Sequence, residues 1–175
     1  IQAEGHVAMK LAGPDLASFD LAFQKPGTNS LIRTNQQFVI RADELYYRSG
    51  SVIFLHNVSV TSPQQPEHEL SCEVLAAFFA GPESKLDQLV AEEKVRVRQG
   101  ELRASGDKVV YWVPKGLLEL TGQPQIVAPG RTYRSDKIVL NRKDSTVRFL
   151  DNYRIELDLD TIRKKTNTVP SVATK

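Results

Sequence analysis

The chain has 175 residues, of which 41% are hydrophobic and 25% charged, ordinary values for a folded domain exposed to water. This length suits one domain with a short tail, and the absence of any run of about 18 apolar residues excludes a membrane-spanning helix. The single cysteine, Cys72, excludes an internal disulfide bond. Because the first residue is Ile1 and not Met, we expect a processed protein or a piece of a longer one.

The net charge is only +2, but the charge is unevenly distributed. Residues 1–93 contain six Lys or Arg against twelve Asp or Glu, whereas residues 94–148 contain twelve against five. This pattern predicts an acidic half and a basic half, which is typical of a molecule with two electrically different ends. The alternative is that exposed strand faces carry these charges without a function.

The N-terminal half predicts short strands separated by turns. Apolar runs occupy residues 16–23, 52–60 and 70–80, and the segment Arg48–Ser51 is a hairpin-turn candidate. The segment Thr61–His68 is polar and rich in proline, so it predicts a loop.

The segment from Glu83 to Lys94 is ambiguous. Leu86, Leu89 and Val90 have helical spacing, but the segment also resembles the N-terminal residues, which alternate as a strand does. We favour a strand from Leu86 onward.

The stretch from Val90 to Val127 predicts four strands. It opens with the alternating residues 94–98, and turn residues follow at 99–101, 114–116 and 121–124. Further apolar or alternating segments at 133–140, 146–150 and 153–160 continue the pattern.

A small residue followed by aspartate and an apolar strand recurs at Ala42-Asp43, Gly106-Asp107 and Ser135-Asp136. Such repeats indicate a stacked β architecture. Together the segments predict an all-β fold of about a dozen antiparallel strands, with one domain over residues 1–160 and a flexible tail over 161–175.

Signatures of chemistry are weak. His6, His56 and His68 lack the spacing of a metal site, and no nucleophile motif or Gly-rich phosphate loop occurs. The sequence therefore predicts no catalysis, no metal and no cofactor.

Basic residues could bind a polyanion, but aromatics make up only 7% of the chain and are not interleaved with them, so we expect no nucleic-acid partner.

The apolar faces of the strands leave two structures open. If the strands close tightly, these faces are only a core. If they splay, they form a groove for acyl chains with basic residues at its rim.

Residues 86–149 resemble the OstA-like family of periplasmic lipopolysaccharide-transport proteins, and Ala3–Val60 shows a fainter match. The segments that resemble the family are the valine strand after Ala91, Gly106–Tyr111, Leu118–Pro124 and Ser135–Leu140. The Leu-Thr-Gly-x-Pro step is the most specific. Glu93 stands where the family usually has glycine.

The resemblance implies a twisted, open β-jellyroll with two sheets and no enzymatic activity. In the family, lipid A acyl chains lie in the interior, and protomers join by edge-strand pairing. The implied partners are lipopolysaccharide and either other transport proteins or a second copy of the chain. The implied location is the periplasm, with a membrane anchor before Ile1 left open.

We expect two sets of site residues. The inward-facing, lipid-binding candidates are Val95, Val97, Val109, Tyr111, Leu118, Leu120, Ile126, Ile138, Leu140, Val147 and Phe149. The head-group candidates are Arg96, Arg103, Arg134, Lys137 and Arg148. The alternatives are a structural β-repeat module that carries no lipid and a polyanion-binding domain.

Overall fold

All regular structure in the computed structural model is β-strand within its described residues, 2–12, 37–81 and 85–158. The strands are β1 (Gln2–Ala12), β2 (Gln37–Arg48), β3 (Ser51–Ser62), β4 (Gln65–Ala80), β5 (Lys85–Gln99), β6 (Leu102–Trp112), β7 (Leu117–Thr121), β8 (Gln125–Ala128), β9 (Arg131–Arg134), β10 (Lys137–Asn141), β11 (Thr146–Leu150) and β12 (Arg154–Leu157). The predicted strand at 16–23 and the predicted tail at 161–175 lie outside the described residues. In the described part of the chain there is no helix that could cross a membrane.

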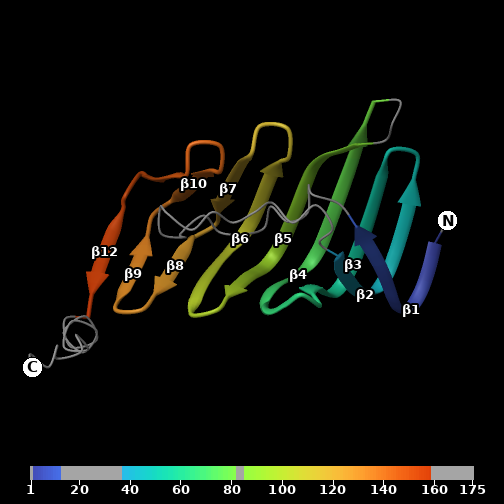
Figure 1. Ribbon diagram of the computed structural model, residues 1–175, viewed down its shortest axis with the longest axis horizontal. Coiled ribbons are helices and arrows are strands. Elements are labelled where there is room, and N and C mark those ends of the chain that lie inside the picture. Colours follow the sequence, from blue (N-terminus) through green and yellow to red (C-terminus); the bar gives the residue numbers. More distant parts are fainter. Residues whose placement is uncertain (1, 13–36, 82–84, 159–175) are drawn as a thin grey trace, which may run out of the picture.

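The strands form one 12-stranded sheet whose pairs are all antiparallel (Figure 1). The main path runs β1-β2-β3-β4-β5-β6-β7-β10-β11. Strand β8 pairs with β6 and β9, and β9 pairs with β12. The all-β fold is confirmed, and the two expected sheets are two parts of one continuous sheet.

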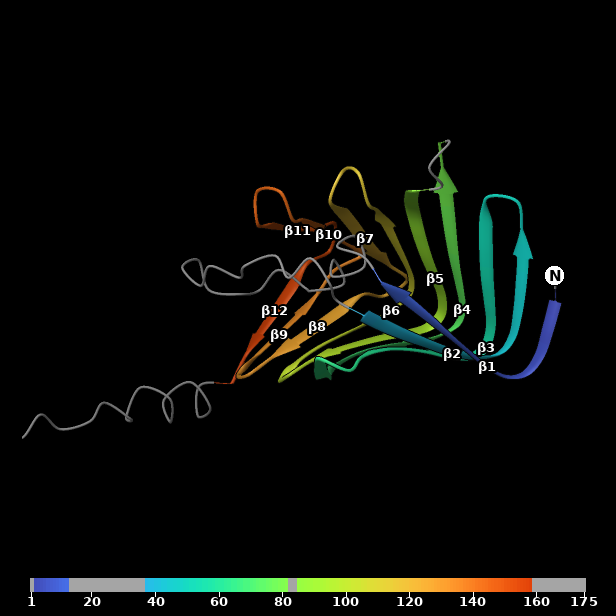
Figure 2. The same cartoon turned by 45° about the vertical axis from the view of Figure 1, so that its right-hand side comes forward.

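The long strands bend, so the sheet has two arms (Figure 2). The register shifts at one level along β1 to β5, as at Arg41/Glu44 and Glu92/Val95. The upper arm comprises β7, β10, β11 and residues 2–4, 44–48, 51–55, 74–80, 85–92 and 108–112. The lower arm comprises β8, β9, β12 and residues 7–12, 37–41, 58–62, 65–72, 95–99 and 102–106.

Residues with left-handed backbone produce several of these bends. Pairs of non-glycine residues with positive φ occur at His56-Asn57, Glu93-Lys94 and Asp151-Asn152. A bulge leaves residues unpaired and turns the strand locally. The repeated aspartates of the sequence, Asp43, Asp107 and Asp136, lie at the same level, so the repeat marks the bend of the sheet.

The segment Glu83–Lys94 is a strand from Lys85 onward, as favoured, with residues 83 and 84 outside the described ranges. Strand β5 is paired along both edges, with β4 and with β6, and this buries Leu89 to 2% exposure. Pairing and burial therefore outweigh the helical spacing of the segment.

The predicted loop at Thr61–His68 is wrong. Strand β3 continues to Ser62, β4 begins at Gln65, and Ser62 pairs with Gln65. The polar residues lie at and beside the tip of a hairpin, where Pro63, Gln64, Pro66 and Glu67 are exposed to water, so a low apolar content does not end the strands.

The core lies between the two arms. Its residues range from Phe54 at 0% to Val97 at 8% exposure, and they form one cluster. Because side chains alternate along a strand, the residues between them face outward.

Cys72 belongs to this cluster, and its thiol provides a test of packing near the bend. Burial, followed by the charge of Glu73, raises the pKa of the thiol from 9.0 to about 12. At neutral pH the thiolate fraction is then about 1,000-fold lower than for a free thiol, and we expect alkylation to slow at least in proportion. Iodoacetamide labelling, followed by mass spectrometry with and without urea, measures this. Rapid labelling of the folded chain would contradict a closed interior at Cys72.

Candidate functional site

Two rows of side chains line the inner face of the upper arm from β2 to β11. The cross-strand register gives the first row as Leu45, Phe54, Leu75, Ala91, Val109, Leu120, Ile138 and Phe149. It gives the second row as Tyr47, Val52, Ala77, Leu89, Tyr111, Leu118, Leu140 and Val147. Apart from the tyrosine hydroxyls, no polar group interrupts either row.

A third row lines the inner face of the lower arm. It consists of Met9, Ile40, Val60, Leu70, Val97, Ala104, Ile126, Tyr133 and Ile155. Tyr133 of the lower arm stacks on Phe149 of the upper arm, with ring centroids 5.2 Å apart and an interplanar angle of 14°. The apolar faces of the two arms therefore meet at this end of the sheet.

The apolar surface continues to an open edge at β12. In the described part of the chain β12 pairs only with β9, and Tyr153, Ile155 and Leu157 are 67%, 49% and 57% exposed. These residues alternate along the strand, so they share one face. An exposed apolar patch on a strand edge is typical of an interaction site.

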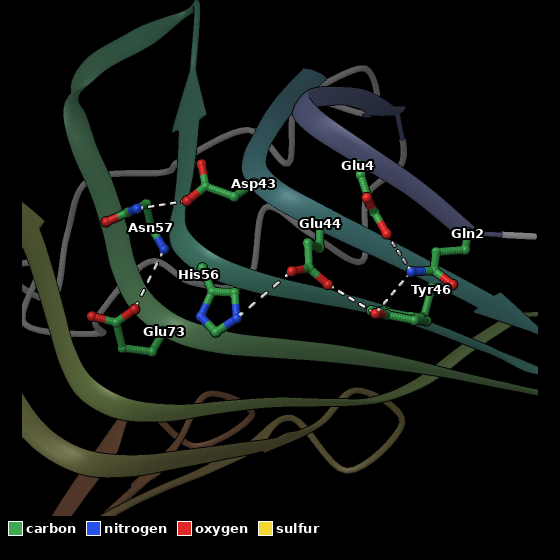
Figure 3. Close-up of polar contacts among 8 residues, drawn as sticks. All are labelled: Gln2, Glu4, Asp43, Glu44, Tyr46, His56, Asn57 and Glu73. Carbon is green, nitrogen blue, oxygen red and sulfur yellow. Dashed lines mark hydrogen bonds and ion pairs between the residues drawn. The ribbon is translucent and has the colours of Figure 1, made fainter.

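Polar side chains hold the outer side of the bend (Figure 3). The Asn57 side chain donates a hydrogen bond of 2.7 Å to Asp43, and the Asn57 backbone N–H donates one of 3.4 Å to Glu73. Asn152 donates to Asp136 at the same distance of 2.7 Å. The same hydrogen bond from asparagine to aspartate thus occurs at two of the three copies of the Asp motif, near both ends of the sheet.

Glu73 also receives a hydrogen bond from the Lys94 ammonium at 3.0 Å. This bond first, and the Asn57 backbone N–H second, lower the pKa of Glu73 below its ordinary value of 4.5. The contact between Lys94 and Glu73 therefore stabilises the bend fully at pH values above 4.5, the ordinary pKa. This stabilisation is lost as the pH falls through the lowered pKa of Glu73.

A second polar chain fixes β1 on β2 (Figure 3). The Gln2 amide donates to Glu4 at 2.8 Å and to the Tyr46 hydroxyl at 3.1 Å, and that hydroxyl donates to Glu44 at 2.8 Å. The hydrogen bond to Glu44 raises the pKa of Tyr46. His56 Nε2 lies 3.9 Å from Glu44, and His56 is largely exposed.

No group of three or more His, Cys, Asp or Glu in the described ranges could hold a metal ion.

The predicted inward-facing residues all lie on the inner faces of the arms. All are buried except Val147 and Phe149, which are half-buried and pack against the core cluster. Their role in lipid binding remains a prediction. The predicted set did not include the inner residues of β2 to β4, such as Ile40, Phe54 and Leu75, although the apolar run at residues 52–60 contains Phe54.

The predicted head-group residues lie on the outer faces of the sheet, not on the inner faces. Arg96, Arg103 and Arg134 are on the lower arm, and Lys137 and Arg148 are on the upper arm. Lys137 forms an ion pair of 2.9 Å with Glu119. The structure thus brings three of the five together on one arm, and a role in binding head groups remains a prediction.

A bent, open antiparallel sheet with an apolar interior defines a class of β-jellyroll scaffold. A family described as "LptA/(LptD N-terminal domain) LPS transport protein" matches residues 39–146. The fold is similar to the crystal structure of LptH, the LptA homologous periplasmic component of the lipopolysaccharide transport device from Pseudomonas aeruginosa. That likeness has a TM-score of 0.55 and 14% identity, and it covers 79% of this chain and 89% of that chain. No match was found among curated proteins.

The chain therefore belongs to the family of the LptA and LptD N-terminal domain lipopolysaccharide-transport proteins. This confirms the resemblance found in the sequence. The family consists of transport proteins and not enzymes, in agreement with the predicted lack of catalysis.

Proposed function

We propose that the chain is a periplasmic carrier that shields the acyl chains of lipid A between its two arms. We propose further that it bridges membranes by pairing its edge strands with another copy or with other transport proteins. The observation that carries the proposal is the set of continuous apolar rows that face each other across the interior. The periplasmic location of LptH supports the compartment.

The length of the rows suits acyl chains. Each upper row crosses eight strands, which at about 4.8 Å per strand gives about 34 Å. The hydrocarbon core of a bilayer is about 30 Å thick and holds two leaflets, so one acyl chain is about half as long as a row and can lie along it over its full length. Acyl chains that lie along the rows therefore exchange one continuous apolar environment for another.

Lipid entry requires the arms to separate. Most interior side chains between β2 and β10 are nearly fully buried, so acyl chains replace contacts between the arms and do not fill an existing space. The arms are joined along the bend, and their far end is marked by the Tyr133–Phe149 stack beside the exposed face of β12. This end is where we expect the arms to part first.

Photo-crosslinking tests the lipid site directly. A photoreactive residue at Val109 or Leu140, both buried on inner faces, should form adducts with lipopolysaccharide in cells. The neighbouring Val110 and Val139 lie on the same strands but face outward, and they serve as matched controls that should form few adducts.

Two outcomes would contradict the carrier. One is the absence of adducts from every inner position while the variants fold and accumulate normally. The other is equal labelling from inner and outer positions, which indicates surface contact alone. Oligomers that form without any lipid adduct would favour the structural β-repeat module.

A further inference from the structure

The outer face of the lower arm contains a hollow of about 400 Å³. Strands β4, β5, β6 and β8 form its floor, on the side of the sheet opposite the apolar interior. Its lining residues are Glu69, Ser71, Arg96, Val97, Arg98, Arg103, Ala104, Ser105 and Val127. Three arginines against one carboxylate give this hollow a positive lining.

The arrangement of the arginines lowers the stability of the sheet, because it brings like charges together. Arg98 and Arg103 are direct cross-strand partners, and like charges in that position destabilise a sheet. Glu69 is the one carboxylate in the lining, and it is engaged with Arg98 at 3.1 Å. Among the described residues Arg96 and Arg103 have no carboxylate partner.

The positive charge continues along the same face. Arg134 and Arg154 on β9 and β12 are again direct cross-strand partners, and Glu156 pairs with Arg134. Hydroxyl groups accompany the charge, because Arg96 has Ser71 on one neighbouring strand and Ser105 on the other. A bound anion would offset the repulsion and use both kinds of donor.

We propose that this hollow binds a phosphate group, either as free phosphate or as a phosphomonoester such as a phosphorylated sugar. Guanidinium groups bind phosphate oxygens with two parallel hydrogen bonds, and serine hydroxyls can donate to the remaining oxygens. Val127 supplies an apolar wall against which a sugar ring can rest. A hollow that gathers three arginines suits a discrete group better than the extended surface of a bilayer.

This site is separate from the proposed lipid interior. Val97 and Ala104 direct their side chains to the interior, while Arg96, Arg98 and Arg103 alternate with them and face the other side. The proposal therefore stands or falls independently of acyl-chain binding.

Calorimetric titration of the full chain with inorganic phosphate and with glucose 1-phosphate tests the site. The double variant Arg96→Gln/Arg103→Gln should weaken binding at least about tenfold, as expected for two lost charge-assisted contacts. The control Lys115→Gln/Lys143→Gln removes the same charge from exposed positions outside the hollow, and its affinity should stay within about twofold of wild type. If glucose 1-phosphate binds more tightly than phosphate, the site reads a sugar-phosphate head group, and if they bind equally, free phosphate suffices.

Thermal unfolding gives a second readout that does not depend on a binding signal. Without phosphate, the Arg96→Gln/Arg103→Gln variant, called the hollow variant below, should unfold at the wild-type temperature or above it. The reason is that the repulsion between Arg98 and Arg103 is removed. Phosphate should raise the unfolding temperature of wild type and of the control but not that of the hollow variant. A hollow variant that unfolds earlier would show that the arginines have a structural role.

Three further results would overturn the proposal. They are an equal loss of affinity in both double variants, no binding of either probe at millimolar concentration, and binding to phosphatidylglycerol vesicles without binding to the soluble phosphates. The last result would assign the face to a membrane surface.

Discussion

Replacement of Gly122 with alanine is expected to lower the free energy of unfolding by about 2–5 kcal/mol, which combines backbone strain with a steric clash. Gly122 has φ +75°, a conformation that alanine rarely adopts. A Cβ at this position would lie 2.4 Å from the Cβ of Asp107, so a rotation of the Asp107 side chain cannot relieve the clash. The backbone N–H of Asp107 also donates to the carbonyl of Gly122 at 3.1 Å, which holds the two strands at this distance.

Gly100 provides a matched control. It also has positive φ, +57°, but no atom lies within 4 Å of a Cβ added there. Gly100→Ala should therefore cost only about 1 kcal/mol, the backbone part of the effect. Urea unfolding followed by circular dichroism measures both variants. In the Gly122→Ala background, Asp107→Gly should recover part of the loss, and equal destabilisation by the two alanine variants would show that contact with Asp107 is unimportant.

This pair of residues illustrates what the sequence revealed and what it did not. The Leu-Thr-Gly-Gln-Pro step was identified as the most specific motif, and it is the place where the chain crosses from the upper arm at β7 to the lower arm at β8. Its need for glycine depends on Asp107, which is fifteen positions earlier in the printed sequence. A pattern of neighbouring residues cannot reveal a contact between two positions that are so far apart in the sequence.

The strands were predictable because alternation of side chains is a local property, and the bends were not. In β4 the buried residues Leu70 and Cys72 are followed by Leu75 and Ala77, so one extra residue at the bend shifts the alternation. In the sequence these positions fall within one mainly apolar run, residues 70–80. The periodicity of a sequence shows which residues are apolar. It does not show where a bulge occurs, and a bulge changes the side of the strand that the following residues face.

The same limit applies to the basic residues. Alternation places Arg96 on the opposite side of its strand from Val95 and Val97, but only the folded sheet shows that this side faces outward. Whether the arms pack together or splay depends on contacts such as Tyr133 with Phe149, which come from different arms. The sequence therefore left the core and the groove equally open.

The double variant Ile155→Lys/Leu157→Lys is expected to abolish end-to-end assembly of the chain. If an edge strand of another copy covers β12, these half-exposed side chains become buried there. The loss of their burial, about 2 kcal/mol in all, weakens association about thirtyfold, and two unpaired charges in the interface weaken it further. Lysine on an edge strand is also a common natural means of preventing strand pairing.

Sedimentation velocity over a series of concentrations measures this assembly. Phe78→Lys is the control, because Phe78 is also an exposed large apolar residue, at 38%, but it lies on β4 between β3 and β5 and not at an edge. Wild type and Phe78→Lys should form larger species as concentration rises, while the β12 variant stays monomeric. If the β12 variant assembles as wild type does, pairing uses β1 or β11, the other strands with one partner in the described ranges. If wild type is monomeric at every concentration, self-assembly is excluded, and the proposed bridge between copies of the chain is contradicted.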